Sequence, residues 1–461
     1  MNQMNNQILL NKLEKLDAWS NETIKNSFLW KSVTSIANPV SNLFKYNSSL
    51  FTLLIISIGL VFISLSLPQF ANDRFGIGLI IIVCFFVFLF NIASNKSLKI
   101  IFNSRDLFIL IFLALAMIST FNSYFLKESL AGLLKYIVFF LWYFMVKITL
   151  LNCSKKIFLN LWSFLCLCGT ITALIGIYQY IIGVEPLATW EDPTQETIHT
   201  RVYSTLGNPN LLAGYLLFIL PLCMTLVFEI KNRLSQLFFL TGSPLILICL
   251  ILTGSRGGYI GLVFSLVVSI IIFFSYFVFQ RKTNKKVTLI LATIGIVAFI
   301  LSLTFLFPVV MERMLTIFTF REHSSNNYRL NVWLACLKML KDNIFVGIGP
   351  GNSTFRLAYG LYMITGFDAL AAYNIFLEIA IEIGLLGCFI FIFIFLLSFL
   401  KLHYLFWQKH SIFSLGIFIS LIGLLTHGMV DTVFFRPQIF VPFWFLLASI
   451  DRIGSELGTK S

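Results

Sequence analysis

The sequence predicts an all-α fold: a polytopic transmembrane helical bundle of about twelve spans, with a large helical non-cytoplasmic loop between spans nine and ten. Of its 461 residues, 58% are hydrophobic and only 11% are charged, whereas a typical soluble domain has about a quarter charged residues. The apolar residues form blocks of about 18 or more, long enough to cross a bilayer as helices. The alternating pattern of membrane-barrel strands is absent.

Hydropathy places the spans, in chain order, at about 49–67, 76–93, 106–122, 130–149, 157–182, 209–228, 235–253, 257–279, 287–309, 373–400, 411–430 and 436–450. The predicted regions are a cytoplasmic N-terminal segment (1–48), spans one to nine (49–309), the outer helical loop (310–372), spans ten to twelve (373–450) and a cytoplasmic tail (451–461). Leucines and tryptophans spaced along the N-terminal segment predict either a helix on the membrane surface or a disordered tail.

Positive charge predicts that both termini are cytoplasmic. With the N-terminus inside, the short inner loops carry thirteen Lys or Arg, namely Lys96, Lys99, Arg105, Lys155, Lys156, Lys231, Arg233, Arg281, Lys282, Lys285, Lys286, Lys401 and Lys409. The short outer loops carry five, namely Arg74, Lys127, Arg201, Arg256 and Arg436. The net charge of +13 therefore reflects membrane topology, and the sequence predicts no nucleic-acid partner.

Arginine dominates the outer face and lysine the inner face. Topology needs only positive charge, whereas the planar guanidinium matches carboxylate, phosphate or bicarbonate. The outer face therefore suggests recognition of an oxyanion, although ion pairing within the same loops would also account for the bias. The Cys and His residues have no metal-ligand spacing and there is no P-loop, so we expect neither metal nor other cofactor.

Two motifs near the outer membrane boundary suggest an anion site. Asn208-Pro209-Asn210 predicts a capped helix start, where backbone N–H groups favour an anion, and Arg201 lies just before it. Arg256 lies in a connection between spans seven and eight so short that its charge must sit at the membrane boundary. Charges at that depth usually face protein or a water-filled cavity. An ordinary helix cap is the structural alternative for the first motif.

The long outer loop contains a predicted amphipathic helix over Asn326–Lys341, with Arg329 in its first turn. The glycine-rich bend Gly347–Asn352 follows, and it could form either a backbone nest for an anion or a simple helix stop.

Glu378 and Glu382 lie four residues apart at the start of span ten, so they share one helix face. A carboxylate that faces lipid is costly, so these two are expected to face protein, where they could carry a proton, bind a cation or form a buried ion pair. Lys135 and Asp431 are the candidate ion-pair partners.

These motifs resemble those of the O-antigen ligase and polymerase superfamily, whose hallmarks correspond here to Gly207–Asn210, Ser255–Gly257, Arg329–Trp333 and Tyr373–Gly387. Within that superfamily, the stretch from Trp190 to Tyr215 is most similar to the cyanobacterial and plastid branch described as inorganic-carbon (bicarbonate) transporters. The resemblance implies a plasma, thylakoid or plastid membrane. It also implies that Arg201, Arg256 and Arg329 correspond to pyrophosphate-binding arginines of the ligases.

The sequence departs from the ligases at Tyr373, where they carry a His thought to act in glycosyl transfer. Tyrosine, with a reference pKa of about 10, is a poor general base. We therefore expect a bicarbonate-transport-related protein with an outward-facing oxyanion site, with Glu378 and Glu382 as candidate coupling groups. The alternatives are a glycosyltransferase using a lipid-linked pyrophosphate sugar, with His323 or His199 as base, and a non-catalytic membrane subunit.

Overall fold

The computed structural model describes residues 2–28, 30–32, 35, 48–68, 76–94, 98–185, 187, 201–280 and 325–458. The predicted ninth span at 287–309 lies outside these residues, as do the candidate bases His199 and His323. All regular structure in the described part of the chain is helical, which confirms the predicted all-α class.

The helices, in chain order, are α1 (Asn2–Asn26), α3 (Ser48–Ser66), α4 (Gly76–Ser94), α5 (Ser104–Phe121), α6 (Leu126–Asn152), α7 (Lys155–Ile182), η1 (Ser204–Leu206), α8 (Pro209–Glu229), α9 (Arg233–Leu252), α10 (Arg256–Gln280), α13 (Ser325–Asp342), α14 (Asn352–Tyr359), α15 (Ile375–Trp407), α16 (Ile412–Gly428), η3 (Val433–Phe435) and α17 (Pro437–Gly458).

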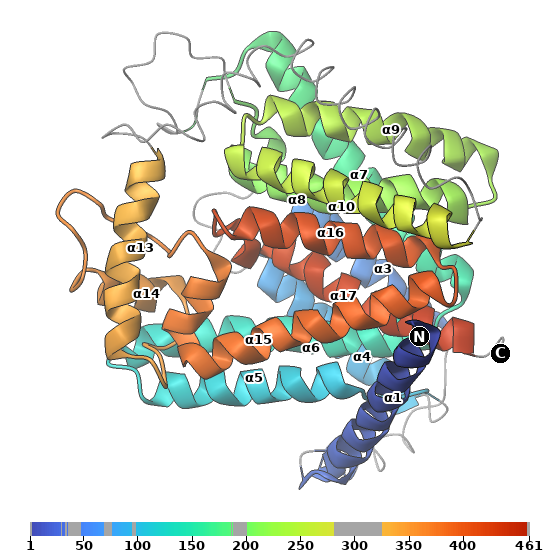
Figure 1. Ribbon diagram of the computed structural model, residues 1–461, viewed down its shortest axis with the longest axis horizontal. Coiled ribbons are helices and arrows are strands. Elements are labelled where there is room, and N and C mark those ends of the chain that lie inside the picture. The colour runs from blue at the N-terminus through green and yellow to red at the C-terminus, as the bar shows by residue number, and fades with distance from the viewer. Residues whose placement is uncertain are drawn as a thin grey trace.

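The long helices run side by side as one bundle, and α13 crosses one end of it (Figure 1). Eight of the described helices are long and apolar enough to span a membrane, and two shorter apolar helices, Gly76–Ile92 and Ile412–Gly428, accompany them. We call the end that holds α13 and α14 the outer end and the opposite end the inner end, after the sidedness that the loop charges predict.

Eleven of the twelve predicted spans coincide with described helices. The ends differ most in α15, which continues to Trp407, and in α17, which continues to Gly458 rather than ending at 450. Hydropathy marks where a segment stops being apolar, but a helix continues wherever protein surrounds its polar residues. The last turns of α17 show this, because Arg452 is buried and the side chain of Asp451 is only 9% exposed.

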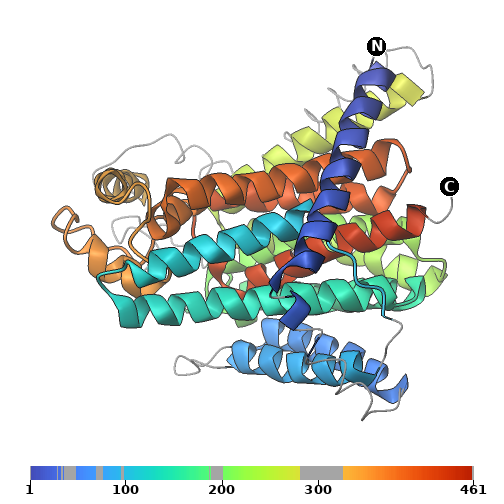
Figure 2. The same ribbon diagram turned by 90° about the horizontal axis from the view of Figure 1, so that it is seen from below.

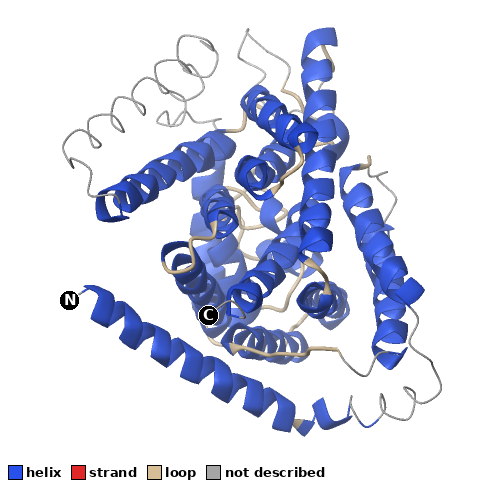
Figure 3. Ribbon diagram, turned by 90° about the vertical axis from the view of Figure 1, so that its right-hand side faces the viewer, coloured by secondary structure: helices blue, strands red, loops and turns tan. Residues whose placement is uncertain are grey.

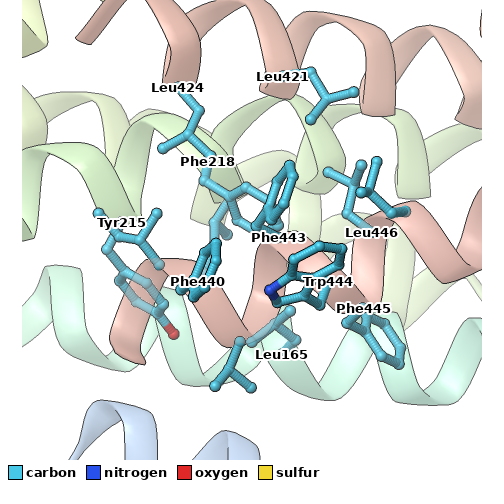
Figure 4. Close-up of a cluster of buried hydrophobic side chains, with 14 of the residues drawn as sticks. Leu165, Tyr215, Phe218, Leu421, Leu424, Phe440, Phe443, Trp444, Phe445 and Leu446 are labelled. Carbon is cyan, nitrogen blue, oxygen red and sulfur yellow. The ribbon is translucent and has the colours of Figure 1, made fainter. Parts of the chain in front are cut away.

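The centre of the bundle is apolar and aromatic. α8 and α17 lie in the middle, and Phe440, Phe443 and Trp444 of α17 pack there with Phe218 of α8 (Figure 4). α17 supplies the acceptors for two indole N–H groups in this region: Trp142 Nε1 donates to the Val441 carbonyl at 3.0 Å and Trp162 Nε1 donates to the Ser449 hydroxyl at 3.1 Å. This core separates the polar groups at the outer end from those at the inner end.

At the inner end, α1 crosses the bundle instead of running along it (Figures 2 and 3). It is held at the start of α5, where Asp17 accepts from the backbone N–H of Ser104 at 2.9 Å and Asn21 accepts from that of Phe102 at 3.1 Å. A carboxylate at a helix N-terminus is favourable because it meets unpaired N–H groups and the positive end of the helix dipole. α1 therefore stabilises the start of α5.

α15 is broken at Gly384, which the sequence did not indicate. Gly384 has φ 85° and ψ 168°, and a Cβ there would lie 2.2 Å from the Phe345 carbonyl oxygen. The segment after α13 fills the break, because Leu385 N–H donates to Ile344 and Ile348 N–H donates to Ile381. Glycine is required both for the backbone angles and for the close approach, and the break attaches the outer loop to the bundle.

Candidate functional site

The outer end brings together side chains that are far apart in the sequence. Arg201 precedes α8, Arg329 lies in the first turns of α13, Tyr373 precedes α15 and Asp431 follows α16. A helix end or tight turn positions each of them, and we call the group of Arg201, Asn210, Arg329, Tyr373 and Asp431 the outer cluster.

Arg201 donates hydrogen bonds to a backbone carbonyl and to a side-chain amide. Its Nε donates to the Thr253 carbonyl at 2.9 Å, and one terminal nitrogen donates to Asn210 Oδ1 at 2.6 Å. Asn208 caps α8 by accepting from the backbone N–H groups of Asn210 and Leu211, with Pro209 in the first helical position. The predicted capped start is therefore present, and it places Asn210 between the Arg201 guanidinium and the next group of the cluster.

Asp431 is the centre of the outer cluster. Its Oδ2 accepts from Asn210 Nδ2 at 2.8 Å and lies 3.9 Å from an Arg329 terminal nitrogen. Its Oδ1 accepts from the backbone N–H groups of Thr432 and Val433. The side chain of Asp431 is 8% exposed and that of Arg329 16%. One carboxylate thus joins the α8, α13 and α16 ends.

The turn that carries Arg256 lies beside Arg201, since Arg201 binds the carbonyl of Thr253 at the start of this turn. Gly254 has φ 60°, and the Ser255 hydroxyl accepts from Gly258 N–H at 3.2 Å, which caps α10. Arg256 is the first residue of α10 and is half-buried. The first two predicted motifs therefore form one continuous region.

Tyr373 lies between α13 and α15 in a left-handed conformation, with φ 52°. A bulky residue with positive φ is unusual and stores local strain. Its ring packs edge-on against Tyr328, with centroids 5.8 Å apart. Burial, the Tyr328 neighbour and Asp431 raise the pKa of the Tyr373 phenol, and Arg329 lowers it less. Tyr373 therefore keeps its proton near neutral pH.

Tryptophan fixes the segment before α15, because Trp333 Nε1 of α13 donates to the Ala372 carbonyl at 2.9 Å. Asn374 then caps α15 and also donates to the Met429 carbonyl at 3.0 Å. The predicted amphipathic helix is α13, and these bonds explain how it holds Arg329 and Tyr373 next to Asp431.

The glycine-rich bend is not an open anion nest. Gly349 N–H donates to the Glu382 carbonyl and Gly351 N–H to the Glu382 carboxylate, at 3.0 and 2.9 Å. A Cβ on Gly349 would lie 2.3 Å from the Ser129 hydroxyl. The bend therefore binds a carboxylate of this same chain and packs tightly onto α6.

Glu382 is buried and bonded, because its second oxygen accepts from the Tyr136 hydroxyl at 3.1 Å. Glu378 is also buried, but its Oε2 has no hydrogen-bond partner among the described residues. Lys135, one of the two predicted ion-pair partners, is exposed. Asp431, the other, binds Asn210 and lies near Arg329. Of the two glutamates, Glu382 is therefore the one that anchors the outer loop.

Sequence reasoning predicts Asp431 only as a partner for the glutamates and assigns His427 no role. His427 is fully buried, and neither ring nitrogen has a partner in the described part of the chain. Glycines make room for it: Cβ atoms on Gly214 and Gly257 would lie 2.9 Å from Nδ1 and 3.0 Å from Nε2. Asp431, one turn further along, was detectable as an acidic residue directly after an apolar span.

The described residues contain no group of three or more His, Cys, Asp or Glu arranged to hold a metal ion. The donors of the outer cluster are guanidinium, amide and phenol groups, which suit an anion.

Residues 241–392 match the family model of the O-antigen ligase. The matched stretch includes Arg256, Arg329, Tyr373, Glu378 and Glu382, whereas Arg201, Asn210 and Asp431 lie outside it. No curated protein matches the chain. The described helices are those of a multi-pass membrane protein, and residues 241–392 are similar to O-antigen ligases.

Proposed function

We propose that the protein is a membrane glycosyltransferase of the ligase or polymerase type, which takes its sugar from a polyprenyl-pyrophosphate carrier at the outer cluster. The observation that carries this proposal is the convergence of Arg201 and Arg329 on Asn210 and Asp431. The ligase match to residues 241–392 supports the same reaction class.

The cluster suits a lipid-linked pyrophosphate in chemistry and in place. Guanidinium groups pair with phosphate oxygens through two parallel N–H bonds, and the start of α8 adds helix-terminal N–H groups. The cluster lies at the ends of the membrane helices, so a carrier lipid could remain in the bilayer while its pyrophosphate reaches the arginines. The turn that carries Arg256 lies beside Arg201, so Arg256 would add a third cation.

The proposed reaction forms a bond between an acceptor hydroxyl oxygen and the anomeric carbon of the donor sugar. The bond from that carbon to the pyrophosphate oxygen breaks, and its electron pair leaves with the polyprenyl pyrophosphate. The arginines stabilise the negative charge that develops on this leaving group. The hydroxyl proton goes to a carboxylate, for which Asp431 is our candidate, while Tyr373 donates a hydrogen bond because its raised pKa keeps it protonated.

The test uses purified full-length protein in nanodiscs with a fluorescent polyprenyl-pyrophosphate oligosaccharide. The acceptor is either a second donor molecule or a glycolipid. We expect transfer by the wild type and a loss of at least about 10²-fold in Asp431→Asn, the size of a general-base contribution. The control is Arg356→Lys, because Arg356 is exposed on α14 outside the cluster. Absence of transfer by folded wild-type protein with both acceptors would refute the proposal.

Oxyanion transport, with bicarbonate as the expected anion, is the second candidate. It is favoured by the break in α15 at Gly384 beside the buried Glu378 and Glu382, since discontinuous helices with polar groups form ion sites in transporters. The aromatic core between the two ends weighs against it. Labelled bicarbonate uptake into proteoliposomes that is lost in Arg256→Ala would favour transport. Binding of the lipid without transfer or uptake would favour a non-catalytic subunit.

A further inference from the structure

The helix α13 has two apolar faces, and the described part of the chain covers only one of them. The covered face is buried against α14 and the start of α15, and it holds Val332, Ala335, Cys336 and Met339. The other face holds Leu330, Leu334 and Leu337, whose spacing places them on one side of the helix. These three leucines, which we call the leucine face, are 45%, 47% and 54% exposed. An exposed apolar face of this kind marks contact with protein or with a membrane.

A polar flank lies between the two apolar faces and shows which way the helix is turned. Asn331, Lys338 and Asp342 share this flank at 3.6 residues per turn, and each is partly or fully exposed. Arg329 lies about half a turn away from them. Its guanidinium is directed toward Asp431 at the end of the bundle, 3.9 Å away. The polar flank is therefore directed away from the bundle, into water.

The leucine face points sideways out of the bundle. It lies about a quarter turn from the polar flank and opposite the covered face. α13 itself runs crosswise beside the outer ends of the long helices (Figures 1 and 2). Because those helices span the membrane, their ends mark the membrane surface, and a side chain that points sideways at this level meets the bilayer.

The exposed apolar surface leads from α13 to the lipid-facing side of a membrane span. After α13 the chain enters the break in α15, where Leu385 N–H donates to the Ile344 carbonyl at 2.8 Å. Phe345 is 85% exposed at this point, and the next turns of α15 expose Leu386 and Phe389. α15 is long and apolar enough to span a membrane, so these side chains face lipid. This continuity favours phospholipid over a protein partner for the leucine face.

We propose that α13 is an interfacial helix whose leucine face inserts among the phospholipid acyl chains of the leaflet at the outer end. Amphipathic helices bind a bilayer in this way, with the apolar face in the acyl boundary and the polar flank in water. Lys341 is exposed beside the leucine face, and its apolar stem allows the ammonium group to reach a headgroup phosphate. This lipid contact does not depend on the reaction at the outer cluster.

The test places a nitroxide spin label on single introduced cysteines in the purified full-length chain. All eight native cysteines are buried, so a thiol reagent labels the introduced one. The matched pair is Leu337→Cys and Lys338→Cys, two exposed neighbours on the same helix that point about 100° apart. Leu386→Cys on α15 gives the lipid reference.

Collision rates are measured in nanodiscs of phosphatidylglycerol and phosphatidylcholine. The two collision partners are oxygen, which concentrates in lipid, and a water-soluble nickel chelate. We expect the label in Leu337→Cys to match that in Leu386→Cys, with frequent oxygen and rare nickel collisions. The label in Lys338→Cys should show the reverse.

Two results would overturn the proposal. Equal nickel access in Leu337→Cys and Lys338→Cys would show that the leucine face lies in water. Protection of the Leu337→Cys label from both oxygen and nickel would show that protein covers the leucine face, either a second copy of the chain or another of its segments.

Discussion

The polar clusters at the two ends of the bundle use arginine differently. At the inner end Arg105 and Lys147 bond to the carboxylates of Asp106 and Asp451, so most of the charge is neutralised within the fold. At the outer end Arg201 donates to the Thr253 carbonyl and to the Asn210 side-chain amide, and Arg329 stands 3.9 Å from Asp431. The inner cluster holds helices together through closely paired, buried charges, whereas the Arg329–Asp431 pair of the outer cluster is longer and its arginine is more exposed.

The largest effect on stability is expected from breaking the inner cluster. Lys147→Ala leaves Asp106 and Asp451 with an uncompensated buried charge, which should destabilise the fold by about 3–5 kcal/mol. Thermal unfolding in detergent would measure the loss. The control is Lys155→Ala, which removes a half-exposed ion pair with Glu229 and should change stability by less than about 1 kcal/mol. Equal effects of the two variants would contradict the structural role of the inner cluster.

The next effect concerns the attachment of the outer loop. Gly384→Ala places a Cβ 2.2 Å from the Phe345 carbonyl oxygen in a backbone conformation reserved for glycine, and should cost at least about 1–3 kcal/mol. The matched change Gly78→Ala, in α4 where nothing lies within 4 Å of the new Cβ, should be neutral or stabilising. Limited proteolysis of the 343–372 segment would report whether the loop has detached. An intact loop in Gly384→Ala would contradict the attachment.

Arg201→Lys should separate charge from geometry in the outer cluster. Lysine keeps the charge but cannot bond to Thr253 and Asn210 together while presenting a planar fork, so transfer should fall about tenfold or more. The unfolding midpoint should stay close to the wild type, because Arg201 is only half-buried. A transfer rate equal to that of the wild type would show that positive charge alone suffices there.

The smallest effect is expected from Tyr373→Phe. Burial and Tyr328 raise the pKa of the phenol, so it is protonated in the folded state and is not a base between about pH 6 and 9. Removing the hydroxyl should lower transfer by less than about tenfold and leave the shape of the pH profile unchanged. Loss of an ionisation from the profile would instead identify Tyr373 as the titrating group.

Most of the bundle could be predicted from the sequence because it depends on local patterns. Apolar blocks gave the spans, Asn208-Pro209-Asn210 gave the start of α8, and apolar spacing gave α13. Each of these features is determined by a few consecutive turns of chain. Contact with lipid or with a neighbouring helix then stabilises it.

What could not be predicted depends on contacts between distant segments. The break at Gly384 arises because the 344–349 segment hydrogen-bonds into α15, and a glycine in an apolar run does not reveal that partner. The inner cluster joins Arg105 to Asp451, residues that topology had assigned to a loop and a tail. The central place of Asp431 likewise depends on Asn210, whose own position follows from the cap of α8.

Binding of undecaprenyl pyrophosphate to the purified protein tests the central claim most directly, because it needs no knowledge of the acceptor. Affinity would be measured for the wild type, Arg329→Lys and the exposed control Arg356→Lys. We predict that Arg329→Lys lowers the affinity by about tenfold or more, which is the size of one charge-assisted hydrogen bond. The affinity of the control should be unchanged. Equal affinity in all three proteins would contradict the assignment of the outer cluster as the pyrophosphate site.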